Sequence, residues 1–326
     1  MDVCRTFQPY SWDLILRPHL LLIFPYIDAM KILSILFFFL FWSFNSFSQA
    51  DSTLFSRLQA IHSNKIDFYK VDGFEISSEK FELEFNKDNI KKVAKKLGVK
   101  GADLSQTDPA LKFSNVYFKD SEEKVKGVVL HSSCYLIEGL DRKLIRISFW
   151  VANKSDKDFE RDFAGLVRNN AIPKEVFNSM EIDSINFGGR KIAVPGICRN
   201  MGVNDVQCPS SGQMSWNVHK SLTDASSTLD DQLTVIRLQK GGKVLSDTVV
   251  NVVFEGKEVA AKKLVYGFKG MNSLLLKMEG AKTLTVYGVA APVRGNFVSC
   301  LMSFWDMDFV GKTGLPVLLE KVMVLK

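Results

Sequence analysis

Two segments of this chain, 155 positions apart, begin alike and continue alike. Residues 147–167 read ISFWVANKSDKDFERDFAGLV, and residues 302–322 read MSFWDMDFVGKTGLPVLLEKV. Each places Ser-Phe-Trp in a strand-like run, followed by a polar turn and by apolar residues at helical spacing. The repeated strand–turn–helix context predicts two related units in tandem, joined near residues 195–210; one large domain is the alternative.

Hydrophobic periodicity predicts the elements of the first half. Two hairpins are expected, turning on Asp72-Gly73 and on Gly188-Gly189. Strands are expected at 111–119, 124–138 and 142–152. A short helix capped by Asp51-Ser52 is expected, with Ile61 on its apolar stripe. A second helix is expected over 89–97, capped by Asp88 and ended by Gly98. A third is expected over 156–169, started by Ser155 and Asp158, and Pro173 is expected to open a further helical turn.

The second half begins with QMSWNVH, a predicted strand, and a predicted helix over 222–239. A last helix is expected from Pro316 through Val322. Between them five strands are expected, at 246–255, 257–268, 272–278, 282–290 and 294–305. This order predicts the α/β (α+β) class: two tandem sandwich-like units, each a mainly antiparallel sheet with flanking helices. The expected domains are 51–195 and 213–326, with a cysteine-stapled connection at 196–212.

Residues 213–326 resemble the Mog1/PsbP-like fold. The resemblance rests on GQMSW at the start, on the meander of strands, and on FVSCLMSFWD and GLPVLLEKV at the end. Proteins of that fold are mostly binding or assembly factors without a shared catalytic site. The resemblance therefore implies a scaffold and assigns no residue a role, because fold alone does not give function.

The first fifty residues are expected to be a leader. Met30 is followed by one lysine, an apolar run over 32–44 and the small-residue ending Ser48-Gln49-Ala50, which are the parts of a secretory signal peptide. The run is shorter than the roughly 20 residues of a membrane-spanning helix, so cleavage near Ala50 is expected, with an uncleaved anchor as the alternative. The mature chain would be periplasmic or extracellular, and it would touch a membrane only through an uncleaved leader.

The mature chain of 276 residues keeps the net charge of +6. A nucleic-acid-binding protein would carry more basic charge, clustered on one face, so no nucleic-acid partner is expected. The densest basic segment is IKKVAKKLGVK, for which a solvated helix face is expected and an anionic lipid or polysaccharide partner is the alternative. Its lysines are Lys91, Lys92, Lys95, Lys96 and Lys100.

Four cysteines lie beyond the leader: Cys134, Cys198, Cys208 and Cys300. Export would place them in an oxidising compartment, where an even number favours disulfides. Nine residues separate Cys198 from Cys208, which is too many for the usual zinc or C-x-x-C spacing. We expect a disulfide there, stapling an irregular segment and worth about 2–3 kcal/mol. Strand alternation directs Cys134 and Cys300 into cores, as free thiols or as a bridge between the halves.

No residue is expected to be catalytic, to bind a cofactor or to hold a metal. The histidines beyond the leader, His62, His131 and His219, have no nucleophile beside them in a suitable context, because Ser132, Ser133 and Cys134 follow His131 in a strand. The three motifs of penicillin-binding proteins can each be matched: S-x-x-K at Ser77–Lys80 or Ser121–Lys124, S-x-N at Ser184–Asn186, and K-T-G at Lys312–Gly314. In those proteins the serine of S-x-x-K begins a helix and K-T-G lies on a strand. The sequence predicts the opposite here, a strand around Ser77 and a segment before a helix for Lys312–Gly314.

Two further features have simple interpretations. Asp306 and Asp308 are too few to hold a cation, and we expect a solvated turn. Trp150 and Trp305 are expected in cores.

The chain is thus expected to be an exported, non-enzymatic binding or assembly protein, with an unknown protein, polysaccharide or envelope partner. The alternative is a secreted hydrolase with an unrecognised site between the two domains.

Overall fold

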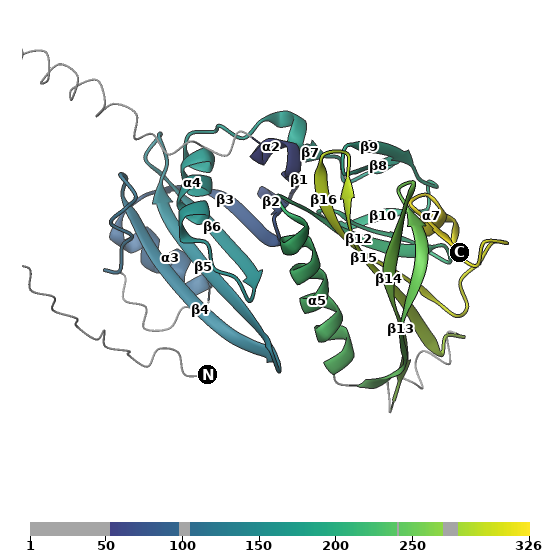
Figure 1. Ribbon diagram of the computed structural model, residues 1–326. Helices are drawn as coiled ribbons and strands as arrows, with labels where there is room; N and C mark the ends of the chain where they lie inside the picture. The colour runs from purple at the N-terminus through teal and green to yellow at the C-terminus, as the bar shows by residue number, and fades with distance from the viewer. Residues whose placement is uncertain (1–52, 98–104, 240, 270–279) are drawn as a thin grey trace, which may run out of the picture. The chain divides into compact units, whose positions relative to one another are not determined.

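The computed structural model describes residues 53–97, 105–239, 241–269 and 280–326 (Figure 1). The expected leader, the strand expected at 272–278 and the helix stop expected at Gly98 lie outside the described residues. Residues Thr53–Lys326 group as one unit. Within the described residues, no helix is long and apolar enough to cross a membrane.

The first half builds a seven-stranded sheet in the order β4-β5-β6-β3-β2-β1-β7. All neighbours are antiparallel except β1 and β7, which are parallel. The strands are β1 (Gln59–Ser63), β2 (Ile66–Val71), β3 (Phe74–Glu84), β4 (Asn115–Val125), β5 (Val128–Glu138), β6 (Lys143–Ala152) and β7 (Phe177–Asn178). The helices are α2 (Leu54–Arg57), α3 (Lys87–Lys96), α4 (Lys157–Arg168) and the 3-10 turn η1 (Lys174–Val176).

The second half builds an eight-stranded antiparallel sheet in the order β10-β11-β12-β16-β15-β14-β13-β17. A separate hairpin, β8 (Ser184–Phe187) and β9 (Arg190–Ala193), precedes it. The sheet strands are β10 (Arg199–Gly202), β11 (Asp205–Cys208), β12 (Gly212–His219), β13 (Gly242–Phe254), β14 (Lys257–Phe268), β15 (Thr283–Val293), β16 (Asn296–Trp305) and β17 (Met323–Leu325). The helices are α5 (Leu222–Leu238) and α7 (Val317–Glu320).

The two sheets share one connectivity, as the repeated Ser-Phe-Trp segment predicts. In the first sheet the meander β1-β2-β3 leads into α3, and in the second sheet the meander β10-β11-β12 leads into α5. A later meander then follows, β4-β5-β6 in the first sheet and β14-β15-β16 in the second. Its last strand pairs antiparallel with the strand before the helix, β6 with β3 and β16 with β12. Trp150 in β6 and Trp305 in β16 therefore occupy equivalent strands. The second sheet differs by its extra strands β13 and β17.

Helices cover both faces of the first sheet. Ile90 of α3 packs against Leu136 and Leu144, whereas Phe163 of α4 packs in the cluster of Tyr135. Residues 135 and 136 are neighbours in β5 and point to opposite faces, as strand alternation requires. The first half is therefore a sheet between two helical layers.

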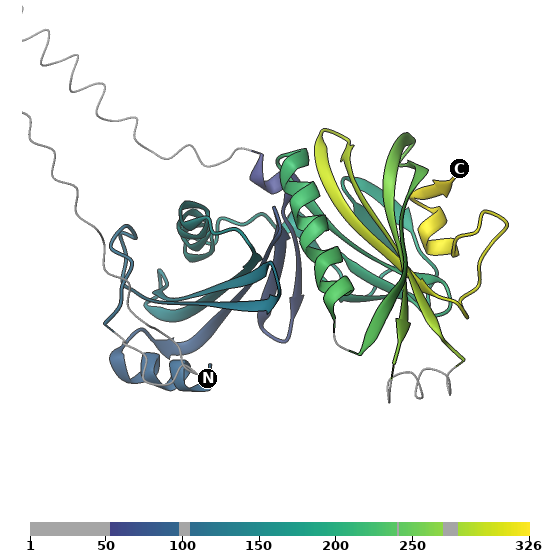
Figure 2. The ribbon, with the colours of Figure 1, turned by 60° about the horizontal axis from the view of Figure 1, so that its bottom comes forward.

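The second sheet is covered in the same way, by α5 on one face and α7 on the other (Figure 2). Leu229 and Leu233 of α5 pack against Leu264 and Val286. Leu318 of α7 belongs to the larger cluster on the other face, together with the buried side chains of the β8–β9 hairpin. The α/β class with sandwich-like antiparallel sheets is thus the observed architecture.

Two helix starts differ from the prediction. Asn86 rather than Asp88 caps α3, because its side chain accepts a hydrogen bond from the Asn89 N–H at 3.0 Å. Asp156 rather than Ser155 caps α4, and it accepts from the Phe159 N–H at 3.0 Å. Asp88 instead lies in the first helical turn, where a negative charge favours the helix dipole.

Two helices are also shorter than predicted. The first, α2, ends at Arg57, so Ile61 lies in β1 and not on a helical stripe. The last, α7, ends at Glu320, and Met323–Leu325 become strand β17, which pairs with β13. In both places the segment gains backbone hydrogen bonds in a sheet, β1 with β2 and β7, and β17 with β13. Local helical spacing cannot reveal such pairing.

The segment between the cysteines is not irregular, and the predicted linker conformation at 196–212 is wrong. Its residues form the β10–β11 hairpin at the edge of the second sheet. A register shift between Asn200 and Gly202, together with Asn204 at a φ of 55°, breaks the two-residue period that identifies strands.

The β8–β9 hairpin turns on Gly188-Gly189, as predicted. It falls inside the expected domain 51–195, yet Ile185, Phe187 and Ile192 pack in the core of the second sheet. The domain boundaries stay a prediction, and this packing favours a join before Ser184.

Candidate functional site

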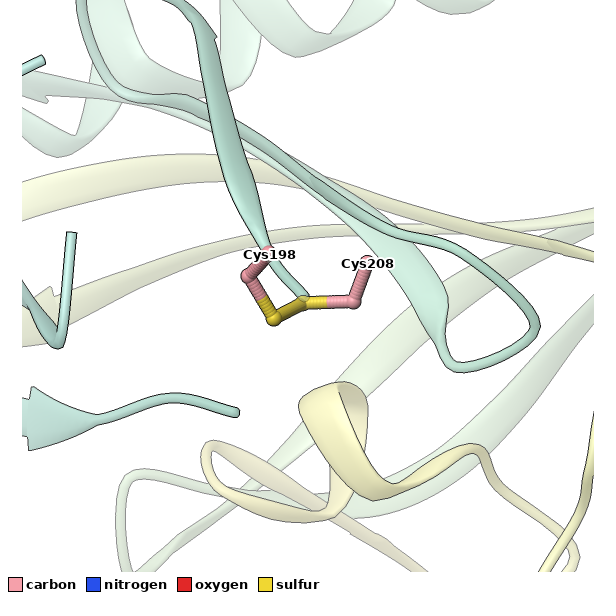
Figure 3. Close-up of a disulfide and its surroundings, with 2 residues drawn as sticks. All are labelled: Cys198 and Cys208. Atoms are coloured by element: carbon pink, nitrogen blue, oxygen red, sulfur yellow. A yellow bond between two sulfur atoms is a disulfide. The ribbon is translucent and has the colours of Figure 1, made fainter. Parts of the chain in front are cut away.

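Cys198 and Cys208 form a disulfide across the β10–β11 hairpin (Figure 3). Their Cα atoms are 4.1 Å apart, and the register that pairs Arg199 with Gln207 brings the two cysteines opposite each other. This is the expected pairing. Because both sulfurs are bonded to each other, neither is available as a thiolate for zinc or for the redox chemistry of a dithiol.

Cys134 and Cys300 are free, so the alternative bridge between the halves is wrong. Cys134 packs beside α3 in the first half, and Cys300 is buried in the core of the second sheet. Burial raises the pKa of both thiols, which keeps them protonated and unreactive.

A cavity of about 460 Å³ lies beside the disulfide-linked hairpin. Its volume is within the range of small-molecule sites. The walls come from β1 and β7 of the first sheet, from the segment leading into the β8–β9 hairpin and that hairpin itself, and from β10, the turn after it and β12. The lining residues include Phe177, Asn178, Ser179, Glu181, Asp183, Ser184, Lys191, Asn200, Gly202, Asn204 and Trp216.

The hairpin that the disulfide closes supplies three of these residues. Asn200, Gly202 and Asn204 lie between the two cysteines. The Asn200 side chain donates to the Ser179 carbonyl at 2.8 Å, which joins the hairpin to the facing wall. At Gly202 a Cβ atom would meet only the Asp205 side chain, at 3.9 Å. The staple therefore fixes one wall of the cavity and leaves space at its glycine.

Two buried hydrogen-bond donors of the cavity lining have no partner among the described residues. They are the Asn204 amide nitrogen Nδ2 and the Trp216 indole nitrogen Nε1. The two residues adjoin, because the Trp216 backbone N–H donates to the Asn204 carbonyl at 3.0 Å. They are 6% and 2% exposed. An unpaired buried donor costs roughly 1–3 kcal/mol, and both nitrogens are enclosed by protein atoms rather than open to the cavity.

Carboxylates add acceptors to the same lining. The Ser184 hydroxyl donates to Asp183 at 2.6 Å, and this bond, with the charge of Lys191, holds the pKa of Asp183 below its usual range. Glu181 also lines the cavity and is exposed. The cavity thus offers anionic acceptors on its exposed side.

The three histidines contact different partners in three different places. His62 Nδ1 is 2.6 Å from Asp67, and His131 Nδ1 is 2.8 Å from the Ser121 hydroxyl. The His219 Nε2 atom is 2.9 Å from the hydroxyl of Ser299.

His219 and Ser299 are the pair with the composition of a catalytic dyad, and both are fully buried. Burial lowers the pKa of His219 to about 4. Its Nδ1 atom has no hydrogen-bond partner among the described residues, so no third group orients the ring as a hydrolase requires. None of the three histidines lines the cavity.

The residues that match the penicillin-binding motifs lie in strands and in a loop, as their sequence predicts. Ser77 lies in β3, Ser184 in β8, and Lys312–Gly314 in the loop before α7. A nucleophile at the start of a helix and a Lys-Thr-Gly strand are thus both missing from these positions. Among the described residues, no three His, Cys, Asp or Glu side chains are close enough to share a metal ion.

Asp306 and Asp308 cap backbone groups of a turn. Asp306 accepts from the Lys282 N–H at 2.9 Å, and Asp308 accepts from the Trp305 N–H at 2.9 Å. Trp305 is half-buried against Phe268, whereas Trp150 is 37% exposed and is not a core residue.

The basic segment of the first half has an exposed helix face, as expected. Its exposed lysines on α3 are Lys91, Lys92, Lys95 and Lys96, and Lys100 lies outside the described residues.

A second polar cluster lies under α4 in the first half. Lys157 Nζ is 3.4 Å from Asp108 and 3.5 Å from Glu160, and it sits 3.1 Å from the centre of the Tyr117 ring. Arg161 binds both oxygens of Asp108, at 3.0 and 3.1 Å.

The charges of this cluster compensate one another. Burial lowers the pKa of Lys157. Burial would raise the pKa of Asp108, but hydrogen bonds from Arg161 and Ala110 and the Lys157 charge hold it below its usual range. Because the buried carboxylates are paired with cations, we interpret the cluster as a structural network that fixes α4.

Comparisons with known proteins give little further information. No protein family matches the sequence, and no curated protein is similar to it. One solved structure that aligns with this chain is the di-domain ARO/CYC StfQ from the steffimycin biosynthetic pathway. It is 9% identical, with 81% of this chain and 77% of that chain covered and a TM-score of 0.16, so it carries no argument here.

The cavity residues were not identifiable as a site from the sequence. The aperiodic stretch from Gly196 to Trp216 contains Asn200, Asn204 and Trp216, and its many asparagines and glycines were the available signal. The opposite wall, at 177–186, comes from a segment that has no such signal.

Proposed function

We propose that this chain is an exported, non-enzymatic binding protein whose ligand occupies the cavity beside the Cys198–Cys208 hairpin. The observation that carries the proposal is the cavity of about 460 Å³, whose lining combines aromatic, amide, hydroxyl and carboxylate side chains. Its volume is within the range of small-molecule sites. The disulfide supports the proposal because it holds the wall that carries Asn204 in place before any ligand arrives.

A binding role is favoured over the alternative of a hydrolase. The cavity lining contains no histidine or cysteine, and the serine beside a carboxylate, Ser184, donates to Asp183 without a further base. Nucleophilic serine chemistry needs a base that takes the hydroxyl proton and a third group that orients that base.

A ligand-dependent thermal shift tests the binding role. The mature chain is screened against a library of sugars, amino acids, dipeptides and small carboxylic acids, and a fragment that binds the native state raises the melting temperature. The variant Gly202→Leu adds a side chain to the cavity lining, at a position where a Cβ would meet only Asp205, at 3.9 Å, so it should lose the shift. The matched control is Gly165→Leu on α4, where a Cβ would meet nothing within 4 Å.

Equal stabilisation of both variants by every hit would place binding elsewhere and contradict the proposal. So would a library without a single hit on the wild-type chain.

Export is a separate part of the proposal and has its own test. It rests on the sequence after Met30 and is compatible with a disulfide, which persists in oxidising compartments. Mass analysis of the full-length product recovered outside the cytoplasm should find a mature N-terminus near Asp51. Soluble cytoplasmic protein that still carries Met1 or Met30 would contradict export.

A further inference from the structure

We propose that the chain forms a two-fold symmetric dimer through the side of its first sheet that carries α3. A second copy would lay its lysine-rich α3 on the part of this side that the first copy's α3 leaves open, and the reverse contact would form at the same time. The residues of this surface do not line the cavity, so the dimer does not depend on the proposed function.

Two large aromatic residues are exposed on the α3 side of the first sheet. The neighbours of Trp150 in β6, Phe149 and Val151, belong to the core under α4, so Trp150 points to the other side. The same alternation in β2 places Phe68 on the α3 side, because Tyr69 lies in the core under α4. Trp150 and Phe68 are each 37% exposed. The blue helix α3 therefore covers only one end of its side of the sheet (Figure 2).

The strand register places carboxylates on both sides of Trp150. Trp150 pairs with Glu75 of β3 on one side and with Ser132 of β5 on the other. Ser132 pairs in turn with Asp120 of β4. The Glu75 side chain is 69% exposed, with Lys70 Nζ 3.8 Å from its carboxylate. Asp120 is exposed and makes no ion pair with a described residue. Both carboxylates are thus placed to meet cations from outside.

The exposed surface of α3 carries the opposite charge. The ten residues of this helix include five lysines and a single aspartate. Helix positions four apart lie in one row, so the lysines form two adjacent rows along the helix. All five are exposed, and none makes an ion pair with a described residue; they are Lys87, Lys91, Lys92, Lys95 and Lys96.

The basic helix and the acidic part of the sheet lie on the same side, which fits a two-fold axis between them. Half a turn about an axis parallel to the sheet would bring α3 of each copy over the open part of the other. Lys87 and Lys96 are nine positions apart, or about 14 Å along a helix. Three strand spacings, about 14 Å, separate Asp120 of β4 from Glu75 of β3. One helix is therefore long enough to reach both carboxylates.

The aromatic residues and the charges would contribute differently. Burial of Trp150 and Phe68 would supply most of the affinity, because tryptophan and other large aromatic residues dominate interface energies. Exposed ion pairs add little affinity, but like charges that face each other across an interface are strongly unfavourable. The charges would therefore determine which part of the surface meets α3.

An anionic membrane is the competing partner for the lysines. Such a surface carries charge of one sign, and it would be repelled by Glu75 and Asp120, which lie on the same side of the sheet as the helix. The mixed charge of this side favours a partner that also carries both signs. A second copy of the chain meets that condition.

Sedimentation velocity of the mature chain at micromolar concentration tests the dimer, which should dissociate as salt is raised. Lys87→Glu, Lys91→Glu and Lys95→Glu together make α3 acidic. Asp120→Lys and Glu122→Lys make the opposing surface basic, because Glu122 is exposed and lies two residues beyond Asp120 in β4. Each combined variant opposes like charges and should weaken dimerisation at least about a hundredfold. An equimolar mixture of the two should recover the dimer, because both contacts then join opposite charges.

A charge-matched control separates the surface from the net charge. It reverses three exposed lysines of the second half, Lys257, Lys282 and Lys312, to glutamate. This variant should dimerise as the wild-type chain does, and circular dichroism confirms that every variant folds.

A wild-type chain that remains a monomer throughout this concentration range would overturn the dimer. Dimers that persist in both combined variants, or a mixture that stays monomeric, would overturn the pairing of α3 with this surface. Monomeric protein that binds phosphatidylglycerol vesicles through the same lysines would assign them to a membrane and overturn the proposal. The thermal-shift screen decides on the proposed function separately, because it measures ligand binding and not association.

Discussion

The two halves of the molecule have one connectivity and two different interiors. In the first half, α4 has twelve residues and lies over a network of paired charges around Asp108 and Lys157. In the second half, the equivalent helix α7 has four residues, and the β8–β9 hairpin shares its face of the sheet. The cavity lies beside this hairpin and the disulfide-linked one.

The two halves differ in what lies beside their sheets. Under α4 the buried carboxylates have cationic partners within the chain, which supports a structural role. Buried side-chain atoms without partners among the described residues occur in both halves, for example Arg146 Nε in the first and Trp216 Nε1 in the second. The cavity, and not the unpaired groups, therefore distinguishes the second half, and a shared topology does not imply a shared site.

The largest expected effect compares the two equivalent phenylalanines of the repeated segment. Phe149 is 1% exposed, whereas Phe304 is only partly buried. Phe149→Ala should lower the free energy of unfolding by about 4 kcal/mol, because it leaves a core cavity. Phe304→Ala should cost about half as much. Urea unfolding measures both, and equal losses would break the comparison.

The charged network should be the next most sensitive. Asp108→Ala leaves Lys157 and Arg161 without their buried partner, and breaking such a pair costs about 3 kcal/mol. The control is Asp247→Ala, which removes a surface pair with Arg237 in the second half and should cost less than about 1 kcal/mol. Similar melting temperatures for the two variants would show that the network is not structural.

Removal of the staple should have a somewhat smaller effect. Cys198→Ser should lower the free energy of unfolding by about 2–3 kcal/mol, since the open hairpin gains entropy when unfolded. Limited proteolysis should then cut within residues 199–208, and the fold should persist. Cys134→Ser, which leaves the disulfide intact, serves as the control. If chemical reduction changes neither melting nor cleavage, the staple does not stabilise this wall.

The pH dependence of stability should come in part from His219. Burial lowers its folded pKa to about 4, below the roughly 6.5 of an unfolded histidine. As the pH falls through 6.5, the unfolded chain binds a proton that the folded chain does not, so stability is lost until about pH 4. Between about pH 7 and pH 5 the loss should be roughly 2 kcal/mol.

His219→Gln should flatten this dependence, whereas His131→Gln should keep it, because His219 is then still present. Urea unfolding at several pH values measures the slope. An unchanged slope in His219→Gln would assign the effect to other groups.

Most of the fold could be predicted from the sequence, because strands and helices that bury one face have a period. The hairpins at Asp72-Gly73 and Gly188-Gly189, the helix α5 and the repeated β6–α4 and β16–α7 segments all follow from local patterns. The exact helix caps could not be predicted, because Asn86 and Asp88 are equally good caps in sequence, and only the structure shows that Asn86 accepts from the Asn89 N–H.

The site could be predicted only in part. The Cys198–Cys208 disulfide follows from spacing and from the expected export. The cavity depends on walls from β1, from 177–186 and from the hairpin, which are far apart in sequence. The charged network has the same character, since Asp108 and Arg161 are 53 residues apart. Single residues with no period, such as Asn204, can be assigned to the cavity lining only when the fold is known.

The most direct test of the binding site is the indole N–H spectrum of the mature chain. Beyond residue 50 the tryptophans are Trp150, Trp216 and Trp305, so the nitrogen-15 NMR spectrum should show three indole signals, assigned with the Trp→Phe variants. Titration with a ligand found in the thermal-shift screen should shift the Trp216 signal strongly, because Trp216 lines the cavity, and leave Trp150 and Trp305 in place. A titration that shifts Trp150 or Trp305 and leaves Trp216 unchanged would contradict the assignment of the cavity as the ligand site.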